Sequence, residues 1–204
     1  MTLVAQLLWA ALAFGLGALP FAVWVGRRVA RRDIREVGDH NPGATNVLRA
    51  SGFGPFLLAM SLDISKAAVP VGLAYQVFGW RGWPMWLVAV APPLGHAFSP
   101  FLRGRGGKAV AAVFGVWIGL TLWELPVVAL AGIAIGFALL TVSGWVVVLS
   151  LLGMLAYLLL WRSDPLLIGV VVTQLPLLVY THRADLARRP SFRPARRWRR
   201  AAGD

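Results

Sequence analysis

The sequence predicts an all-α, polytopic integral membrane protein with seven transmembrane helices, several of them short. Hydrophobic residues make up 58% of the 204 residues, charged residues only 14%, and the mean hydropathy is +0.71. Soluble domains of this length carry far more charge, so these proportions exclude a soluble fold. Uncharged runs recur along the chain, and arginine and lysine cluster in some of the connections between them, as in multi-pass membrane proteins.

The apolar runs begin with residues 3–25. This run has no charge, no basic segment before it and no small-residue cleavage pattern after it, which predicts a retained anchor and not a removable signal peptide. The further runs are residues 54–78, 83–94, 109–123, 125–140, 145–160 and 165–180. A crossing usually needs about 20 residues, so the third run is unusually short.

Three basic groups predict the orientation of the chain: residues 27–49, 103–108 and 183–200. Because Lys and Arg concentrate in cytoplasmic loops, all three groups belong on the cytoplasmic side. This placement requires an even number of crossings between successive groups, so the short third run must cross the membrane. We expect the N-terminus outside, the C-terminus in the cytoplasm, residues 1–182 as the membrane domain and residues 183–204 as a basic tail.

The formal net charge of +12 predicts that the chain binds an anionic partner. In a membrane protein the natural partner of the basic tail is the anionic lipid headgroup, at about 1 kcal/mol per basic residue near the surface. A lipid bilayer with anionic headgroups is therefore predicted as a partner, and nucleic acid is not.

Two polar segments, residues 38–49 and 94–108, hold glycines beside cations. Their members are Gly43, Thr45 and Asn46 before Arg49, and Gly104, Gly106 and Gly107 before Lys108. Successive amides in a Gly-rich turn form an anion-binding concavity, and a nearby cation adds charge, so phosphate is the predicted ligand. Leu102 and Ala109 stand where a nucleotide-binding loop needs Gly and Ser or Thr, which argues against ATP. The positive-inside bias alone, or a flexible Gly-rich connector, are simpler explanations that stay open.

Asp63 and Lys66 lie inside the second apolar run. They are three residues apart and therefore share one helix face. Charges at this depth are costly in lipid, so the two side chains should face the bundle interior and pair with each other or with the backbone. A structural ion pair and a functional group are both compatible with this pattern.

The histidines are further candidate functional residues. His96 follows Gly95 at the cytoplasmic end of the third run, where an imidazole usually bonds a carbonyl. His182 and Asp185 lie one turn apart just after the last run, and they predict either an acid/base or orienting pair, or a solvated helix end. The chain has no cysteine, and His40, His96 and His182 are widely separated, so no metal site and no cofactor are predicted.

Several motifs resemble those of the bacterial acyl-phosphate:glycerol-3-phosphate acyltransferase family of the PlsY type. Residues 41–49 (NPGATNVLR) are similar to the family's G-S-G-N-[IP]-G-A-T-N-x-x-R, and residues 95–108 to its H-x-F-P-x-F-x-x-x-K-G-G-K segment. His182, Arg183 and Asp185 resemble H-R-x-N-I, and Leu62 to Lys66 resemble L-D-x-x-K. The resemblance covers nearly the whole chain.

This resemblance implies a seven-helix enzyme of the bacterial inner membrane with its active site on the cytoplasmic side. Such an enzyme transfers a fatty acyl group from acyl phosphate to the 1-hydroxyl of glycerol 3-phosphate, and releases lysophosphatidate and phosphate. The catalytic candidates are Lys108, His182, Asp185 and Asp39. The substrate-binding or phosphate-binding candidates are Asn41, Gly43, Thr45, Asn46, Arg49, His96, Gly106, Gly107 and Ser143, with Asp63 and Lys66 in supporting roles.

The chain also departs from the family's pattern. Asp39 stands where the family usually has Ser, Asp185 replaces the usual Asn, and a Ser-rich segment is reduced to Thr141 and Ser143. A carboxylate beside a phosphate site repels the ligand unless it is protonated or paired with a cation. The alternatives are a divergent paralogue with altered or lost activity, or a small membrane transporter or scaffold in which Asp63 and Lys66 form a relay. Acyl-chain preference and oligomeric state do not follow from the sequence.

Overall fold

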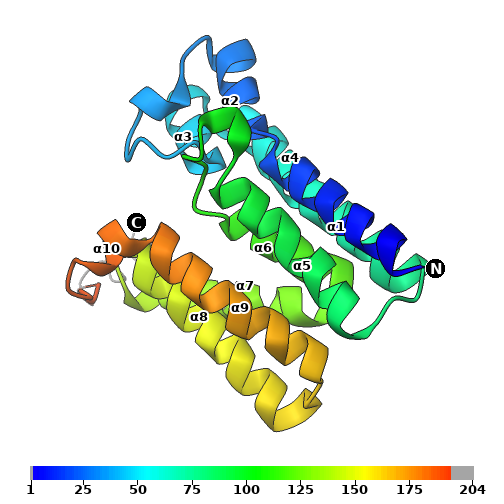
Figure 1. Cartoon of the computed structure of the whole chain (residues 1–204). Coiled ribbons are helices and arrows are strands. Elements are labelled where there is room, and N and C mark those ends of the chain that lie inside the picture. The colour runs from blue at the N-terminus through cyan, green and yellow to red at the C-terminus, as the bar shows by residue number, and fades with distance from the viewer. Residues whose placement is uncertain (1, 194–204) are drawn as a thin grey trace.

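The computed structural model describes residues 2–193, which form an all-helical bundle with one isolated β-bridge between Leu140 and Phe192 (Figure 1). The α-helices are α1 (Leu3–Ala18), α2 (Phe21–Val25), α3 (Ala44–Ser51), α4 (Phe53–Gly72), α5 (Gly82–Ala97), α6 (Val110–Thr121), α7 (Glu124–Leu139), α8 (Ser143–Tyr157), α9 (Pro165–Thr181) and α10 (Arg183–Leu186). Short π-helical segments cover Gly26–Ala30, Leu73–Val77 and Leu158–Arg162, and 3-10 turns cover Ile34–Glu36 and Pro100–Leu102.

The helix lengths agree with the predicted membrane protein. Four helical segments are long and apolar enough to cross a membrane: Leu3–Val29, Phe53–Val77, Gly82–Leu102 and Ser143–Arg162. Three shorter apolar helices, α6, α7 and α9, accompany them. The all-α, multi-pass fold is thus confirmed, whereas seven full crossings remain a prediction.

The first predicted span is interrupted. The sequence predicted one run over residues 3–25, but α1 ends at Ala18 and a new helix starts at Phe21. Pro20 lies at the break, because proline has no N–H to continue the helical hydrogen bonds. The carbonyl groups released there find other donors: Ala18 O accepts from Ser99 Oγ at 2.6 Å, and Leu19 O accepts from Lys66 Nζ at 2.7 Å.

The third span is longer than predicted. We expected it to end at Leu94, where polar residues begin, but α5 continues to Ala97. The continuation is possible because Gly95 lies directly on the backbone of α1, where a Cβ would collide with Phe14 O. Close helix contact through small residues is typical of membrane bundles, and it carries the polar His96 into the protein interior.

The helices form two layers (Figure 1). One layer contains α1, α4, α5 and α6, and the other contains α7, α8 and α9. Contacts of α5 with α9 and of α6 with α7 join the layers. Within the first layer, Gly115 of α6 lies against the backbone of α4, where a Cβ would collide with Ile64 O. A buried apolar cluster that includes Met85, Trp117 and Met154 fills the bundle.

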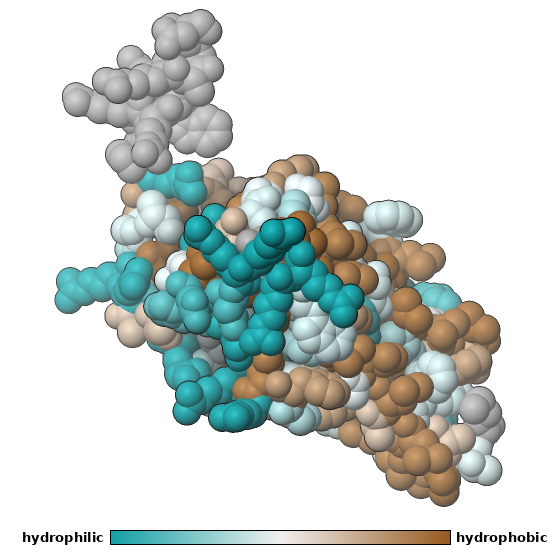
Figure 2. All heavy atoms as spheres, turned by 90° about the horizontal axis from the view of Figure 1, so that it is seen from above, coloured by the Kyte–Doolittle hydropathy of each residue, from teal (hydrophilic) through white to brown (hydrophobic). Residues whose placement is uncertain are grey.

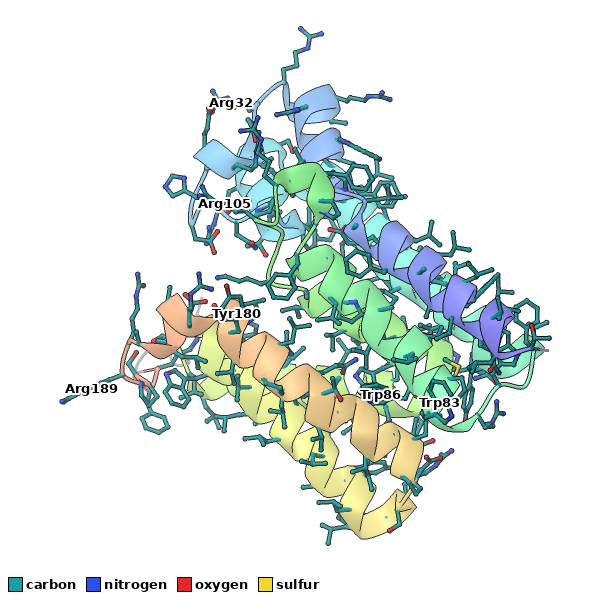
Figure 3. All side chains as sticks on the ribbon, viewed as in Figure 1. Arg32, Trp83, Trp86, Arg105, Tyr180 and Arg189 are labelled. Atoms are coloured by element: carbon teal, nitrogen blue, oxygen red, sulfur yellow. The ribbon has the colours of Figure 1, made fainter. Side chains whose placement is uncertain are left out.

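The basic segments gather at one end of the bundle. Figure 3 shows Arg32, Arg105 and Arg189, one from each segment, at the same end, with Trp83 and Trp86 toward the other. Figure 2 likewise shows hydrophilic side chains at this end and apolar side chains over the rest of the visible face. This grouping agrees with the predicted sidedness, although the direction of the chain in a membrane stays a prediction.

Part of the segment predicted as a polar loop is a helix. Residues 44–51 form α3, with Ala44, Asn46 and Val47 buried and Gly52 ending the helix at a φ of 84°. Ala44 and Val47 are three residues apart and pack on α2 and α4 in one apolar cluster. The sequence did not reveal this helix, because glycines and polar residues surround the two apolar residues that form its buried face.

The described part of the basic tail does not extend freely from α10. The backbone N–H of Thr141 donates to Ser191 O at 3.0 Å, and that of Arg193 donates to Leu139 O at 2.8 Å. Trp145 Nε1 also donates to Arg188 O at 2.9 Å. Residues 187–193 therefore return to the connection between α7 and α8, whereas the rest of the predicted lipid-binding tail lies outside the described residues.

Candidate active site

Lys108 lies at the centre of a cluster of polar side chains between the two layers. Its Nζ donates to Asp39 Oδ2 and to Asp185 Oδ2, at 2.8 Å in each case. Asp185 also accepts from Ser143 Oγ at 3.2 Å. We call Lys108, Asp39, Asp185 and Ser143 the Lys108 cluster. Its members come from the loop before α3, the loop before α6, the start of α8 and α10, so the fold unites segments that are far apart in the sequence.

The two glycines before Lys108 place it in this position. Gly106 N donates to Ala97 O at 3.0 Å, and Gly107 N donates to His96 O at 3.1 Å. A Cβ on Gly106 would collide with His96 O. The expectation that these amides bind phosphate is therefore not met, because both N–H groups bond the last carbonyls of α5. The glycines instead let the loop pack closely enough to hold Lys108.

Asn46 organises the segment that carries Asp39. The Asn46 side chain is buried and donates to Asp39 Oδ1 at 3.0 Å and to Asn41 O at 2.9 Å, while its Oδ1 accepts from Arg49 at 2.9 Å. Arg49 also lies 3.8 Å from Asp39 Oδ1. Asn46 thus uses its amide N and O to position its neighbours, unlike the direct phosphate ligand that the sequence predicted.

The charges of the Lys108 cluster stabilise one another. Partial burial raises the pKa of the Asp39 and Asp185 carboxyls, but the hydrogen bonds and charge of Lys108 outweigh it, so the net pKa of each lies below its usual value. Burial likewise lowers the pKa of Lys108, and the two carboxylates more than compensate, which raises it overall. At neutral pH the cluster therefore holds one positive and two negative charges.

His182 lies next to the Lys108 cluster at the end of α9. It is buried, and its Nδ1 lies 2.9 Å from Leu178 O, an arrangement in which Nδ1 carries the proton and donates it to the carbonyl. This assignment leaves Nε2 as an acceptor. Burial lowers the His182 pKa more than the bond to Leu178 raises it, and Lys108 lowers it further, so the ring is neutral at pH 7.

The predicted His182 and Asp185 pair does not form a direct hydrogen bond in the described residues. The ring of His182 turns back to its own helix, whereas Asp185 in α10 bonds Lys108 and Ser143. Sequence spacing placed both residues on one helical face, but α9 ends at Thr181 and the chain changes direction there. The two residues remain neighbours, because the side chains of both lie against Gly144.

Asp63, Lys66 and His96 form a buried group beneath the cluster. Lys66 Nζ lies 2.7 Å from Asp63 Oδ1 and donates to Leu19 O, so the predicted ion pair within α4 is confirmed. His96 Nδ1 lies 4.0 Å from Asp63 Oδ1 and has no hydrogen-bond partner within residues 2–193. The expected carbonyl bond of His96 is therefore not formed, because its ring lies against Gly107, with Nε2 where a Cβ on that glycine would collide with it.

A cavity of about 730 Å³ opens at the Lys108 cluster and extends between the layers. Its polar end includes Asp39, Arg49, His96, Lys108 and His182, and Asn41, Gly43, Thr45 and Ser143 also line it. Apart from Asp63 of α4 and Ser150 of α8, the rest is mostly apolar and includes Val110, Phe114 and Trp117 of α6, Leu130, Ile133 and Phe137 of α7, and Val147, Leu151 and Met154 of α8. These apolar residues were not identified as site residues from the sequence, although their recurrence every three or four positions is the pattern of one helix face. Among the described residues, no group of three or more His, Asp or Glu side chains could hold a metal ion.

Known proteins resemble this chain over most of its length. The family model for glycerol-3-phosphate acyltransferase matches residues 7–190. The glycerol-3-phosphate acyltransferase of Maridesulfovibrio salexigens is 37% identical over 187 residues, which cover 88% of this chain and 91% of the relative. That of Thermus thermophilus is 39% identical over 180 residues, with 87% of each chain covered.

Other matches are shorter or more distant. The enzyme of the same name from Desulfovibrio desulfuricans is 43% identical, but that match spans 59% of this chain and 53% of the relative. The crystal structure of PlsY (YgiH), an integral membrane glycerol 3-phosphate acyltransferase, in its glycerol 3-phosphate form superposes with a TM-score of 0.83 at 24% identity. That superposition covers 95% of this chain and 98% of the other, so the helical fold is shared.

Proposed function

The chain belongs to the glycerol-3-phosphate acyltransferase family, and on this premise we propose that it transfers a fatty acyl group from an acyl phosphate to the 1-hydroxyl of glycerol 3-phosphate. The products are lysophosphatidate and phosphate, so the reaction serves phospholipid biosynthesis. One observation carries the proposal: a single cavity joins a cation-lined polar end to an apolar interior. Both substrates carry phosphate and only the donor carries a long apolar chain, so each end of the cavity matches part of the reacting pair.

Lys108 and Arg49 are the proposed phosphate ligands. Both line the cavity, and their side chains keep 24% and 50% of their surface exposed. A phosphate that enters displaces at least one carboxylate from Lys108, and the charge-assisted bonds it forms replace those lost. The same cations stabilise the negative charge that grows on the acyl oxygen and on the departing phosphate.

His182 is the proposed general base. In the reaction the glycerol oxygen attacks the acyl carbon, the bond from that carbon to the phosphate oxygen breaks, and the hydroxyl proton must be taken up. The neutral ring of His182 lines the cavity and leaves Nε2 as an acceptor, so it can take the proton and return it to the leaving phosphate. Asp39 and Asp185 are less suited to this step, because their lowered pKa values make them weak bases.

The two carboxylates have a different proposed role. Asp39 and Asp185 hold Lys108 from opposite segments, and Ser143 fixes Asp185 in turn. We assign them to positioning Lys108 before the substrates bind. His96 lines the cavity and is proposed to contact a substrate there, while its buried, unpartnered Nδ1 faces Asp63 Oδ1 at 4.0 Å and Asp63 and Lys66 support the ring from behind.

The proposed setting is the bacterial inner membrane. Seven crossings would place the N-terminus outside, the Lys108 cluster and C-terminus in the cytoplasm, and the shared basic end at the cytoplasmic headgroups. The division into a membrane domain of residues 1–182 and a basic tail of residues 183–204 belongs to the same proposal, with anionic lipids as the partner of the tail. The polar end of the cavity then faces a water-soluble acceptor, and its apolar part lies at the depth of the lipid tails.

A donor comparison tests the function. Purified protein is offered glycerol 3-phosphate with palmitoyl phosphate or with palmitoyl coenzyme A, and lysophosphatidate is measured. We expect product with palmitoyl phosphate, and product with palmitoyl coenzyme A alone would refute the proposed donor. Lys108→Ala should abolish transfer, whereas Arg105→Ala, an exposed cation of the same loop outside the cavity lining, should retain it.

A further inference from the structure

The cavity ends at a defined depth inside the bundle. On α6 the lining residues are Val110, Ala111, Val113, Phe114 and Trp117, which follow one side of the helix from the polar end inward. At about 1.5 Å per residue, Val110 to Trp117 spans about 10 Å, and Ser143 to Met154 on α8 spans about 16 Å. Trp117 and Met154 are the deepest lining residues of their helices and are both fully buried.

The protein is closely packed beyond that depth. Leu120 lies almost one turn below Trp117 on α6, and Leu158, the first residue of the π-helical segment that continues α8, lies one turn below Met154. Both belong to the buried apolar core and neither lines the cavity. The space between the layers therefore closes at Trp117 and Met154.

A hydrogen bond fixes the orientation of Trp117. Its Nε1 donates to Gln174 Oε1 at 2.9 Å, and Gln174 is 1% exposed. Gln174 lies one turn deeper on α9 than Leu178, which lines the cavity. A buried glutamine among apolar neighbours is costly unless it bonds a partner. The bond thus ties α6 of one layer to α9 of the other where the cavity ends.

The side toward α7 is more open than this end. The cavity-lining residues Leu130 and Phe137 of α7 are 52% and 40% exposed, whereas Leu151 of α8 is 5% exposed. An apolar chain can thus enter beside α7 from the surrounding lipid, but it meets a wall of buried side chains at its far end.

From this geometry we infer that Trp117, held by Gln174 and flanked by Met154, is the floor that sets the longest acyl chain the enzyme uses efficiently. The inference rests on the proposed function and adds a specificity-determining residue to it. In a closed apolar pocket, one methylene too many changes kcat/KM by about 10- to 200-fold. Activity should therefore fall steeply once the donor chain reaches the floor.

Variants at the floor should shift this limit in opposite directions. Trp117→Leu and Met154→Ala deepen the cavity and should raise kcat/KM at least about tenfold for the first donor beyond the wild-type limit. Ala129→Leu adds bulk at the deep end of the lining of α7 and should move the limit to shorter donors. Trp80→Leu is the matched control, because Trp80 is also buried but does not line the cavity.

The measurement is kcat/KM for a series of saturated acyl phosphates of increasing length, with folding checked by size-exclusion chromatography and thermal unfolding. A wild-type profile in folded Trp117→Leu, Met154→Ala and Ala129→Leu proteins would overturn the inference and show that the chain leaves sideways into lipid. If Trp117→Leu does not fold, the other two variants decide. A wild-type protein inactive with every acyl phosphate would instead refute the proposed function, so the two failures are distinct.

Discussion

Replacement of Asp185 by asparagine tests how the Lys108 cluster works. The carboxylate accepts from Lys108 Nζ at 2.8 Å, and the Asp185 and Lys108 side chains are 20% and 24% exposed. A hydrogen bond to a charged group contributes about 1.5–3 kcal/mol. The amide introduced by Asp185→Asn can keep the bond from Ser143 and occupies the same volume, but it no longer carries the charge that competes with phosphate for Lys108.

The expected result is tighter binding of glycerol 3-phosphate with little change in turnover. Solvent screening and the second carboxylate, Asp39, reduce the effect to the lower end of that range. At about 1.4 kcal/mol per factor of ten, KM should fall roughly tenfold, while kcat changes by no more than a few-fold. Initial rates over a glycerol 3-phosphate titration at saturating palmitoyl phosphate give both constants.

A matched control and the opposite outcome complete this test. Asp164→Asn changes a carboxylate that caps α9 and lies outside the cavity lining, and asparagine can provide the same cap, so both constants should stay at the wild-type values. If Asp185→Asn instead lowers kcat by several orders of magnitude at an unchanged KM, Asp185 is the proton acceptor and our assignment of His182 is wrong.

Three further predictions concern the supports of the site. Because the pKa values of Asp39 and Asp185 are lowered and that of Lys108 is raised, the Lys108 cluster stabilises the fold between about pH 4 and pH 10. Its contribution is lost as the pH falls through the carboxyl pKa values or rises through the Lys108 pKa. The melting-temperature difference between wild type and Lys108→Met should therefore shrink outside this window, and a constant difference would contradict the prediction. Gly106→Ala should reduce kcat/KM about 100-fold because its Cβ would displace the loop, whereas Gly153→Ala, which meets nothing within 4 Å, should not. Lys66→Met should lower the free energy of unfolding by about 3–5 kcal/mol, because it leaves Asp63 charged and buried. In a denaturant titration, the double variant Asp63→Leu/Lys66→Met should recover most of that loss. Equal losses in the single and the double variant would exclude a structural pair.

The membrane fold could be predicted well from the sequence, because composition and the positions of charged residues indicate it without knowledge of tertiary contacts. Uncharged runs and basic groups can be recognised without knowledge of packing. The short third run, which the basic groups require to cross the membrane, forms the helix α5. Its true end at Ala97 was missed because the continuation depends on Gly95 meeting α1, a contact between distant segments. The break at Pro20 was missed because hydropathy averages over it.

The sequence identified several residues of the site but not the contacts that they make. Lys108, Arg49 and His182 were identified as candidates, and all three line one cavity. The amides of Gly106 and Gly107 were assigned to phosphate because sequence alone does not show which carbonyls lie opposite them. The apolar lining, including Trp117, was unassigned because all the long helices of this protein are apolar, and only packing separates a cavity wall from a lipid-facing surface.

The two-layer architecture also governs how the enzyme is made. Residues up to Thr121 complete the first layer and present Asp39 and Lys108, yet the partner carboxylate and the histidine arrive only with α9 and α10 at the end of synthesis. A ribosome-bound chain that lacks these last segments has an incomplete cavity lining and lacks the residue that we propose as the general base. We therefore expect activity only after α9 and α10 have been synthesised.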